Sequence, residues 1–280
     1  MRFVSFEKDG RPGWGALLGE EVIDLGGRAP TLHAALGAGV LPRSASDLPG
    51  GAGRLQLGQL TLQTPLPGVG RIFCIGLNYF AHREEAGRSP TTKPVIFVRF
   101  PSSLTAHGQP LMAPPESATY DFEGELAVII GRAGRRIREE DALGHVAGYS
   151  CFMDGSIREF QMHTSQYTPG KNFDHSGAFG PCLVTADEVG DPNAGLQLRT
   201  RLNGALVQEA TTDLMLFPVP HLIAYLSSFM RLQPGDVIAT GTPGGVGFAR
   251  QPPLYMKPDD RVEVEIERVG LLTNTVVAET

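Results

Sequence analysis

The sequence has few cysteines and no long apolar run. Its three cysteines, Cys74, Cys151 and Cys182, are far apart and odd in number, which argues against a disulfide framework or a thiolate zinc site and predicts buried free thiols. No apolar run approaches the roughly 20 residues that span a bilayer, and the charged residues 7–9 interrupt the first apolar stretch. We therefore expect a soluble, cytoplasmic protein in a reducing compartment, without a membrane partner.

The sequence also lacks a block of charge of one sign and an internal repeat. Its 30 acidic and 24 basic side chains give a net charge of -6 and are spread along the chain. This distribution argues against a nucleic-acid partner, because nucleic acids bind clustered positive charge. The absence of a repeat period excludes solenoids, propellers and coiled coils.

Glycine and proline dominate what is present. The 280 residues contain 35 glycines and 22 prolines, dispersed so that they divide the chain into short segments, and 41% hydrophobic content is enough for a large core. We expect a β-rich α+β fold with few helices. Asp9-Gly10 predicts a hairpin turn within a small N-terminal α+β domain of residues 1–68, and residues 69–280 form the predicted catalytic domain.

Strand patterns crowd together after residue 70, and one segment has helical periodicity. The helix is expected at 219–230, where apolar residues recur at spacings of three and four before Pro234-Gly235. The expected strands are 71–75, 95–100, 124–130, 180–184, 196–202, 237–240 and 261–267.

Two glutamates at the start of one strand are the first candidates for chemistry. Glu123 and Glu125 are two residues apart, so their side chains share a face of the strand. Five apolar residues follow, 126–130, which is typical of a strand buried on both faces, and two carboxylates entering such a core need a cation. The alternative is a solvated strand face, as in 262–267, where strict alternation separates Glu263 and Glu265 from the apolar residues.

A third carboxylate completes a candidate metal site. Asp154 ends an otherwise uncharged run and precedes Gly155, so it is either a ligand or a turn residue. Carboxylate oxygens are preferred by Mg²⁺, Mn²⁺ and Ca²⁺, whereas zinc sites prefer histidine and cysteine. We therefore predict a site for Mg²⁺ or Mn²⁺, with Ca²⁺ as a further possibility, at Glu123, Glu125 and Asp154.

A histidine and a lysine could supply proton transfer and charge. His82 and Glu85 are three residues apart, which would place them on one face of a helical turn and let the carboxylate orient the imidazole as a general base. Lys171 lies in an expected polar loop and could bind a substrate carboxylate. Each has a simpler alternative as a solvated surface residue. The glycine-rich segment 241–247 lacks a phosphate-loop pattern, but its N–H groups could face a ligand.

Together these residues resemble the fumarylacetoacetate hydrolase family, from about Arg71 to the carboxyl terminus. The departures from the family pattern are Arg99, Met153 and Pro169. The matching residues, in order, are Gly76-Leu77-Asn78-Tyr79, His82, Glu85, Glu123-Gly124-Glu125-Leu126, Gly148-Tyr149, Asp154, Ser156, Arg158, Gln161, Gly170-Lys171, Phe179-Gly180-Pro181, the segment 234–243 and Gly245-Val246-Gly247.

The resemblance implies a fold and a site. It implies a mixed β-sandwich roll, a homodimer, and magnesium or manganese held by Glu123, Glu125 and Asp154. It also implies that His82 and Glu85 lie on a lid with a catalytic role, that Lys171 is catalytic, and that the substrate is contacted by Arg158, Gln161, Gly241 and Thr242.

The implied activity is hydrolysis of a carbon-carbon bond in a small 2,4-dioxo acid, of the acylpyruvate or fumarylpyruvate type, through a metal-bound enolate, as in aromatic catabolism. The same site could decarboxylate oxaloacetate, or tautomerise, isomerise or hydrate 2-oxo acids. A hypothesis of another class is a calcium-binding protein without turnover, although calcium favours more oxygen ligands than these three.

Overall fold

The computed structural model describes residues 1–279, and strands dominate it. The strands are β1 (Arg2–Lys8), β2 (Arg11–Leu18), β3 (Glu21–Asp24), β4 (Arg54–Gln56), β5 (Thr61–Leu62), β6 (Ile72–Gly76), β7 (Val95–Arg99), β8 (Leu104–Thr105), β9 (Leu111–Ala113), β10 (Tyr120–Asp121), β11 (Gly124–Ile130), β12 (Val146–Met153), β13 (Ser156–Ile157), β14 (Gly177–Thr185), β15 (Gln197–Leu202), β16 (Ala205–Thr211), β17 (Val237–Ala239), β18 (Arg261–Ile266) and β19 (Gly270–Ala278). The helices are α1 (Leu32–Ala38), α2 (Phe80–Glu85), α3 (Arg158–Gln161), α4 (Thr168–Lys171), α5 (Ala186–Val189) and α6 (Val219–Phe229).

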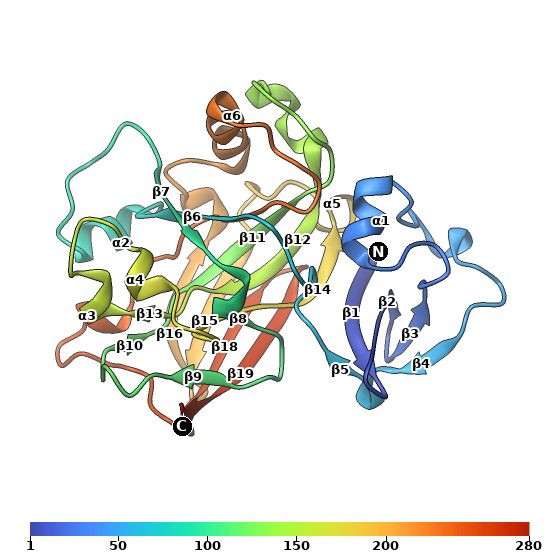
Figure 1. Ribbon diagram of the computed structural model, residues 1–280. Coiled ribbons are helices and arrows are strands. Elements are labelled where there is room, and N and C mark those ends of the chain that lie inside the picture. The colour runs from blue at the N-terminus through green and yellow to red at the C-terminus, as the bar shows by residue number, and fades with distance from the viewer. Residues whose placement is uncertain (280) are drawn as a thin grey trace.

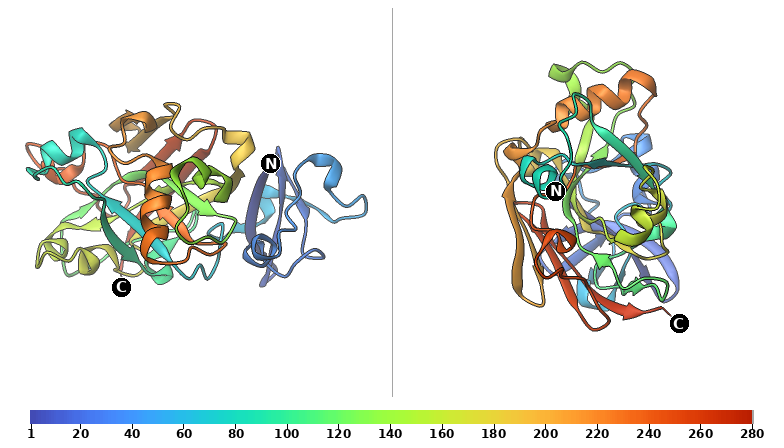
Figure 2. Two further views of the ribbon diagram at one scale, coloured as in Figure 1. Left: turned by 90° about the horizontal axis from the view of Figure 1, so that it is seen from above. Right: turned by 90° about the vertical axis from the view of Figure 1, so that its left-hand side faces the viewer.

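Two packed sheets form the body of the molecule (Figures 1 and 2). The larger sheet has the order β4-β3-β2-β1-β14-β12-β11-β17-β6-β7, with β5 paired to β1 and β8 to β14. The smaller sheet has the order β16-β15-β18-β19-β9, and it lies against β11, β12 and β14. This arrangement confirms the predicted β-rich α+β class.

Strand β11 lies at the centre of the core. Leu126, Val128 and Ile130 belong to one apolar cluster and Ala127 and Ile129 to another, and all five side chains are fully buried. The run of apolar residues therefore marks a strand covered on both faces, as predicted. The three cysteines are buried free thiols, which confirms that prediction as well.

The N-terminal strands stand to one side of this body but join its larger sheet (Figure 1). β1 and β2 form the predicted hairpin, and Asp9 and Gly10 both have positive φ, 51° and 71°, the geometry of the tight turns that suit twisted strands. β1 then pairs with β14 through Arg2 and Phe3. The domain boundary at residue 68 stays a prediction.

The seven predicted strands all exist, with bounds shifted by at most a few residues. The strand predicted at 124–130 has those bounds in the structure, and the one predicted at 180–184 is part of the longer β14. Three long strands of the two sheets, β12, β16 and β19, had no prediction. β12 and β19 contain glycine and small polar residues that weaken the strand pattern, and β16 alternates less regularly.

Helix α6 confirms the predicted helix and its apolar face. Leu222, Ile223 and Leu226 are buried, while Phe229, an apolar residue of the predicted segment 219–230, is 52% exposed at the end of the helix. No helix within residues 1–279 is long and apolar enough to cross a membrane.

Strand β18 gives the predicted contrast with β11. Val262, Val264 and Ile266 are buried, and the glutamates between them pair with arginines on the outer face. The side chain of Glu265 is 45% exposed and that of Glu263 14%, because Arg261 partly covers Glu263. The face is therefore solvated, though less evenly than the alternation predicts.

Candidate active site

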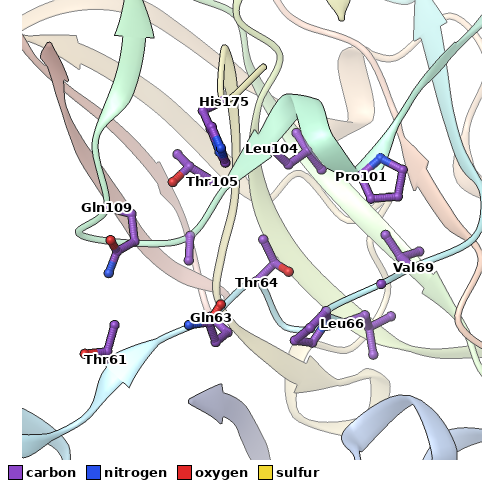
Figure 3. Close-up of a pocket in the computed structure, with 13 residues that line it drawn as sticks. Thr61, Gln63, Thr64, Leu66, Val69, Pro101, Leu104, Thr105, Gln109 and His175 are labelled. Carbon is purple, nitrogen blue, oxygen red and sulfur yellow. The ribbon is translucent and has the colours of Figure 1, made fainter. Parts of the chain in front are cut away.

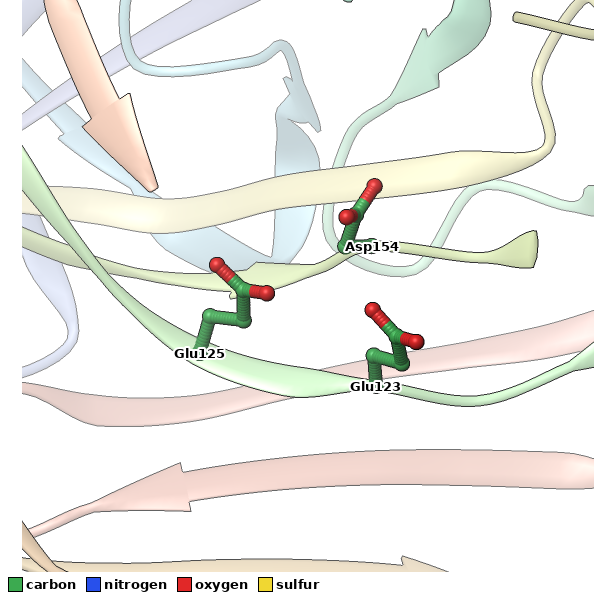
Figure 4. Close-up of side chains that lie close together, drawn as sticks. All are labelled: Glu123, Glu125 and Asp154. Carbon is green, nitrogen blue, oxygen red and sulfur yellow. The ribbon is translucent and has the colours of Figure 1, made fainter. Parts of the chain in front are cut away.

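Three carboxylates meet where β11 begins and β12 ends (Figure 4). Glu123 directly precedes β11, Glu125 is its second residue, and Asp154 directly follows the antiparallel β12. The Asp154 N–H donates to the carbonyl of Glu123 at 2.8 Å, which holds the two strand ends together. One oxygen from each side chain lies within 4.8 Å of the others, and all three residues are buried.

Three basic side chains surround the carboxylates. Lys171 Nζ lies 2.7 Å from Glu123 Oε2 and 2.7 Å from Asp154 Oδ2. Arg99 Nη1 donates to the other oxygen of Asp154 at 2.6 Å, and Arg158 Nη2 lies 2.6 Å from Glu123 Oε1. All three cations are buried, so the strong pairing offsets the cost of removing these charges from water.

The prediction that Lys171 lies in a polar loop is wrong. Lys171 is the last residue of α4, a single helical turn whose first turn contains Pro169, and only 1% of the residue is exposed. Proline is well tolerated there because the first N–H groups of a helix have no partner within it. The turn directs the ammonium group inward, where two carboxylates bind it.

The carboxylates have opposite protonation tendencies. Burial alone would raise the pKa of Glu123, but the charges of Lys171 and Arg158 lower it below its usual range. Burial, together with the charges of Asp154 and Glu123, raises the pKa of Glu125 well above its usual range. Glu125 is therefore the carboxyl group of the cluster that has too little positive charge nearby to hold it ionised.

This imbalance fits a divalent metal ion. Among residues 1–279, Glu125 has no lysine, arginine or histidine within ion-pair distance, unlike Glu123 and Asp154. The donor set consists of oxygens alone, which suits Mg²⁺ or Mn²⁺, and these ions keep several water ligands when few protein ligands are present. The residues present therefore fit the predicted ion.

The predicted pair of His82 and Glu85 forms on α2. His82 Nδ1 lies 2.9 Å from Glu85 Oε1, and the N–H of Gly245 donates to Glu85 Oε2 at 2.8 Å. Gly245 has a φ of 101°, and a Cβ at this position would lie 2.4 Å from the carbonyl oxygen of Val207. Only glycine fits there, so the glycine-rich segment fixes the carboxylate that orients the imidazole.

Two adjacent cavities bring these groups together. An inner cavity of about 30 Å³ and an outer one of about 310 Å³ share Leu77, His82 and Gln161. The inner cavity is lined by Ile75, Gly76, Leu77, His82, Phe97, Glu123, Glu125, Gln161, Lys171 and Thr242. The outer cavity is lined by Leu77, His82, Ala86, Arg88, Arg158, Gln161, Met162, Tyr167 and Phe248. His82 therefore borders the same space as the carboxylates and Lys171.

A larger cavity elsewhere lacks comparable chemistry. The cavity in Figure 3, of about 330 Å³, lies beside Thr61, Thr64, Thr105 and His175, and no carboxylate or basic side chain other than His175 lines it. Cavity volume alone would therefore point away from the carboxylate cluster.

The other residues expected at the site lie close to it, and each makes a different contact there. Arg158 Nη1 donates to Gln161 Oε1 at 2.8 Å across α3, which fixes both side chains. The N–H of Gly241 donates to Glu125 Oε2 at 2.8 Å, so Gly241 holds a carboxylate and does not line the cavity. The hydroxyl of Thr242 lines the inner cavity and donates to the carbonyl of Gly124 at 3.0 Å.

Three supporting side chains had no assigned role in the sequence. Arg99, noted only as a departure from the family pattern, binds Asp154. Asp121 accepts from Arg158 and from the N–H of Gly247, which ties α3 to the glycine-rich segment. Gln208, from the facing sheet, accepts from Gly124 N–H and donates to Thr242. Asp121 adjoins the Glu123 motif and could have been noticed, whereas Gln208 has no local signal.

Comparison with known proteins gives consistent matches. The family model described as fumarylacetoacetate (FAA) hydrolase C-terminal matches residues 71–277. The oxaloacetate tautomerase fahd2, mitochondrial, of Xenopus laevis is 39% identical over 289 residues, which cover 99% of this chain and 90% of that protein. The oxaloacetate tautomerase FAHD2A, mitochondrial, of Homo sapiens is 41% identical over 221 residues, 78% of this chain and 70% of that protein.

Solved structures agree with the fold over the whole chain. A fumarylacetoacetate hydrolase from psychrophilic Exiguobacterium antarcticum superposes with a TM-score of 0.89 at 36% identity, with full coverage of both chains. Maleylpyruvate hydrolase from Sphingobium sp. SYK-6, in complex with manganese(II) and pyruvate, superposes with a TM-score of 0.83 at 30% identity, again with full coverage of both chains.

Proposed function

The chain belongs to the fumarylacetoacetate hydrolase family, and on that basis we propose that it is a divalent-metal-dependent enzyme that interconverts the keto and enol forms of a small 2-oxo acid of the oxaloacetate type. The observation that carries the proposal is the inner cavity, which His82 lines together with Glu123, Glu125 and Lys171. Enolisation needs a base beside the carbon that loses a proton and positive charge beside the carbonyl oxygen. Both are present within one small space.

The carboxylates are the proposed ligands of Mg²⁺ or Mn²⁺. When bound, such an ion would polarise the 2-oxo group and increase the acidity of the adjacent carbon. Lys171 and Arg158 support this role because they lower the pKa of Glu123 and keep it ionised as a donor. Arg99 fixes the orientation of the third ligand, because it donates to the oxygen of Asp154 that Lys171 does not bind.

His82 is the proposed proton carrier. Its Nδ1 is engaged by Glu85, which leaves Nε2 for the substrate. Nε2 would take a proton from C3 of the keto acid, and the Glu85 carboxylate would stabilise the resulting imidazolium. The same nitrogen would then return the proton, to the enolate oxygen or to C3 according to direction. One proton is returned for each proton taken, so the reaction needs no other reactant.

The remaining predicted residues would orient the acid. Gln161 and Thr242 line the inner cavity together with Lys171. Arg158 holds only the oxygen of the Gln161 amide, which leaves its N–H groups for the acid, while Thr242, whose hydroxyl is bonded to Gly124 and Gln208, would contact the acid at the cavity wall. Arg158 reaches the outer cavity beside His82. An inner space of about 30 Å³ leaves room for little beyond the reacting groups, which limits access of water to the enolate.

We favour tautomerisation over hydrolysis, although hydrolysis is the activity expected from the sequence. The relatives named oxaloacetate tautomerases are 39–41% identical, whereas the maleylpyruvate hydrolase is 30% identical. Hydrolysis of an acylpyruvate is the second candidate because His82 and Glu85 could also activate a water molecule. Both reactions share the enolate, and they differ in whether water attacks a second carbonyl.

The test is to add purified enzyme to enol-oxaloacetate and follow the loss of the enol ultraviolet absorbance, with products identified by NMR. Tautomerisation predicts rapid conversion to the keto form, loss of catalysis on chelation and recovery with Mg²⁺ or Mn²⁺. The same preparation is offered acylpyruvate and fumarylpyruvate. Hydrolysis of these at a higher kcat/KM, with no acceleration of enol loss, would reverse the assignment.

The predicted homodimer and cytoplasmic location are part of this proposal, and the predicted role in aromatic catabolism belongs to the second candidate, acylpyruvate hydrolysis. The relatives named above are described as mitochondrial, so location does not follow from the family. Light scattering of the purified protein tests the dimer directly.

A further inference from the structure

The outer cavity contains two arginines with very different surroundings. Arg158 is paired with Asp121 and Glu123, and its guanidinium lies 4.6 Å from the ring centroid of Phe248. Arg88 lines the same cavity from its exposed side, and it has no ion pair or side-chain hydrogen bond with any residue in the range 1–279 that the structure describes. Arg88 is therefore the unneutralised positive charge of this cavity.

The turn that follows α2 brings Arg88 back to the outer cavity. Gly87, with a φ of 61°, donates its N–H to the carbonyl of Glu84 at 3.0 Å, and the N–H of Arg88 donates to the carbonyl of Arg83 at 3.1 Å. This pair of bonds is the Schellman motif, which closes a helix and reverses the chain. Helix α2 thus places His82 at the inner cavity, and the turn that follows the helix places Arg88 at the outer one.

Most of the other residues that line the outer cavity are apolar, and Arg88 is the unpaired charged side chain among them. Leu77, Ala86, Met162, Tyr167 and Phe248 supply mostly apolar surface. A volume of about 310 Å³ is at the low end of ligand sites, which span about 300–1,000 Å³, so the ligand is small. An unpaired guanidinium in such a space favours a carboxylate, which it can bind through two parallel hydrogen bonds.

We propose that Arg88 is a specificity-determining residue that binds the second carboxylate of a 2-oxo dicarboxylate, while the 2-oxo acid end occupies the inner cavity. The inference rests on the proposed function for the position of the reacting end. It goes further because it requires a dicarboxylate and assigns its distal group to one side chain.

The experiment compares oxaloacetate with its C4 methyl ester, which keeps the reacting end and removes the distal charge. Both are assayed for metal-dependent enolisation with wild type, Arg88→Ala, Arg88→Lys and the control Arg83→Ala. Arg83 is on α2, five residues before Arg88; its guanidinium lies 5.8 Å from the Phe80 ring centroid, and it does not line either cavity. Thermal melting checks that each variant is folded.

For oxaloacetate, Arg88→Ala should lower kcat/KM roughly 10- to 100-fold, mainly through KM, as expected for a lost hydrogen-bonded charge pair. The ester should react equally with wild type and Arg88→Ala, Arg88→Lys should restore part of the preference, and Arg83→Ala should match wild type. An unchanged ratio of the two kcat/KM values in Arg88→Ala overturns the role of Arg88.

Failure of the proposed function gives a different result, because wild type would then enolise neither compound. In that case calorimetric binding of oxaloacetate and its ester to the Mg²⁺-loaded proteins decides the point. Tighter binding of oxaloacetate than of the ester by wild type, lost in Arg88→Ala, supports the carboxylate site. Equal binding of both compounds by wild type overturns it.

Discussion

Replacement of Lys171 by methionine removes the cation that joins two carboxylates and leaves a side chain of similar length. Lys171 Nζ is 2.7 Å from both Glu123 and Asp154, and the residue is 1% exposed. Burial disfavours its charge, but Asp154 and Glu123 raise its pKa above the usual range, so the ammonium is ionised at neutral pH. Lys171→Met therefore leaves two buried carboxylates without their shared partner.

The expected loss is large in the metal-free protein. Removal of one partner of a buried pair costs about 3–5 kcal/mol. At about 2–3 °C per kcal/mol for a chain of this size, Tm should fall by roughly 6–15 °C. Added Mg²⁺ should recover more stability in Lys171→Met than in wild type, because a divalent ion beside the same oxygens supplies the missing positive charge. Enolisation should still be impaired, since Lys171 lines the inner cavity.

The assay is thermal unfolding in chelator and in excess Mg²⁺, with Lys257→Met as the matched control. Lys257 is exposed, so its replacement should change stability by less than about 0.5 kcal/mol. A metal-free Tm for Lys171→Met equal to that of the control would refute the view of Lys171 as the buried counter-ion of the site.

Three further predictions concern the carboxylates. Glu123→Gln and Asp154→Asn should each weaken Mg²⁺ binding, measured by calorimetry, by more than about 100-fold, since even the partners of ligands are worth 10–100-fold. Glu125→Gln should raise the Tm of the chelated protein at pH 7 and abolish the further rise on adding metal. The sign follows because a carboxyl whose pKa is raised on folding opposes folding once the pH exceeds its ordinary pKa, and glutamine removes that cost. Glu263→Gln and Glu265→Gln should leave kcat/KM unchanged and stability within about 1 kcal/mol, because these side chains form outer-face ion pairs; a large loss would refute the contrast between β11 and β18.

The parts of the site that lie close in sequence were predictable. The spacing of Glu123 and Glu125 on a strand and of His82 and Glu85 on a helical turn each fixes a face, because strand and helix periods are local properties. The apolar run after Glu125 identified a strand buried on both sides, and β11 has the predicted bounds.

The contacts that join distant segments were not predictable from local pattern. Lys171 binds Glu123 across 48 positions of sequence, so nothing near Lys171 distinguished it from a solvated loop residue. Gln208 reaches Thr242 from the facing sheet, and the position of that sheet depends on packing rather than on the sequence around Gln208. Arg88 was overlooked because its role depends on the turn formed by Gly87 and on the cavity beyond it.

The most direct test of the central claim is the rate at which the C3 protons of oxaloacetate exchange with deuterium, followed by proton NMR in D₂O. Mg²⁺-loaded wild type should accelerate exchange, and chelation should remove the acceleration. His82→Ala should lower the catalysed rate by about 10²- to 10⁴-fold while its Mg²⁺ affinity, measured by calorimetry, stays that of wild type. Exchange at the wild-type rate in His82→Ala, or in the chelated wild-type enzyme, would contradict the account of a histidine and a metal acting on one enolisable acid.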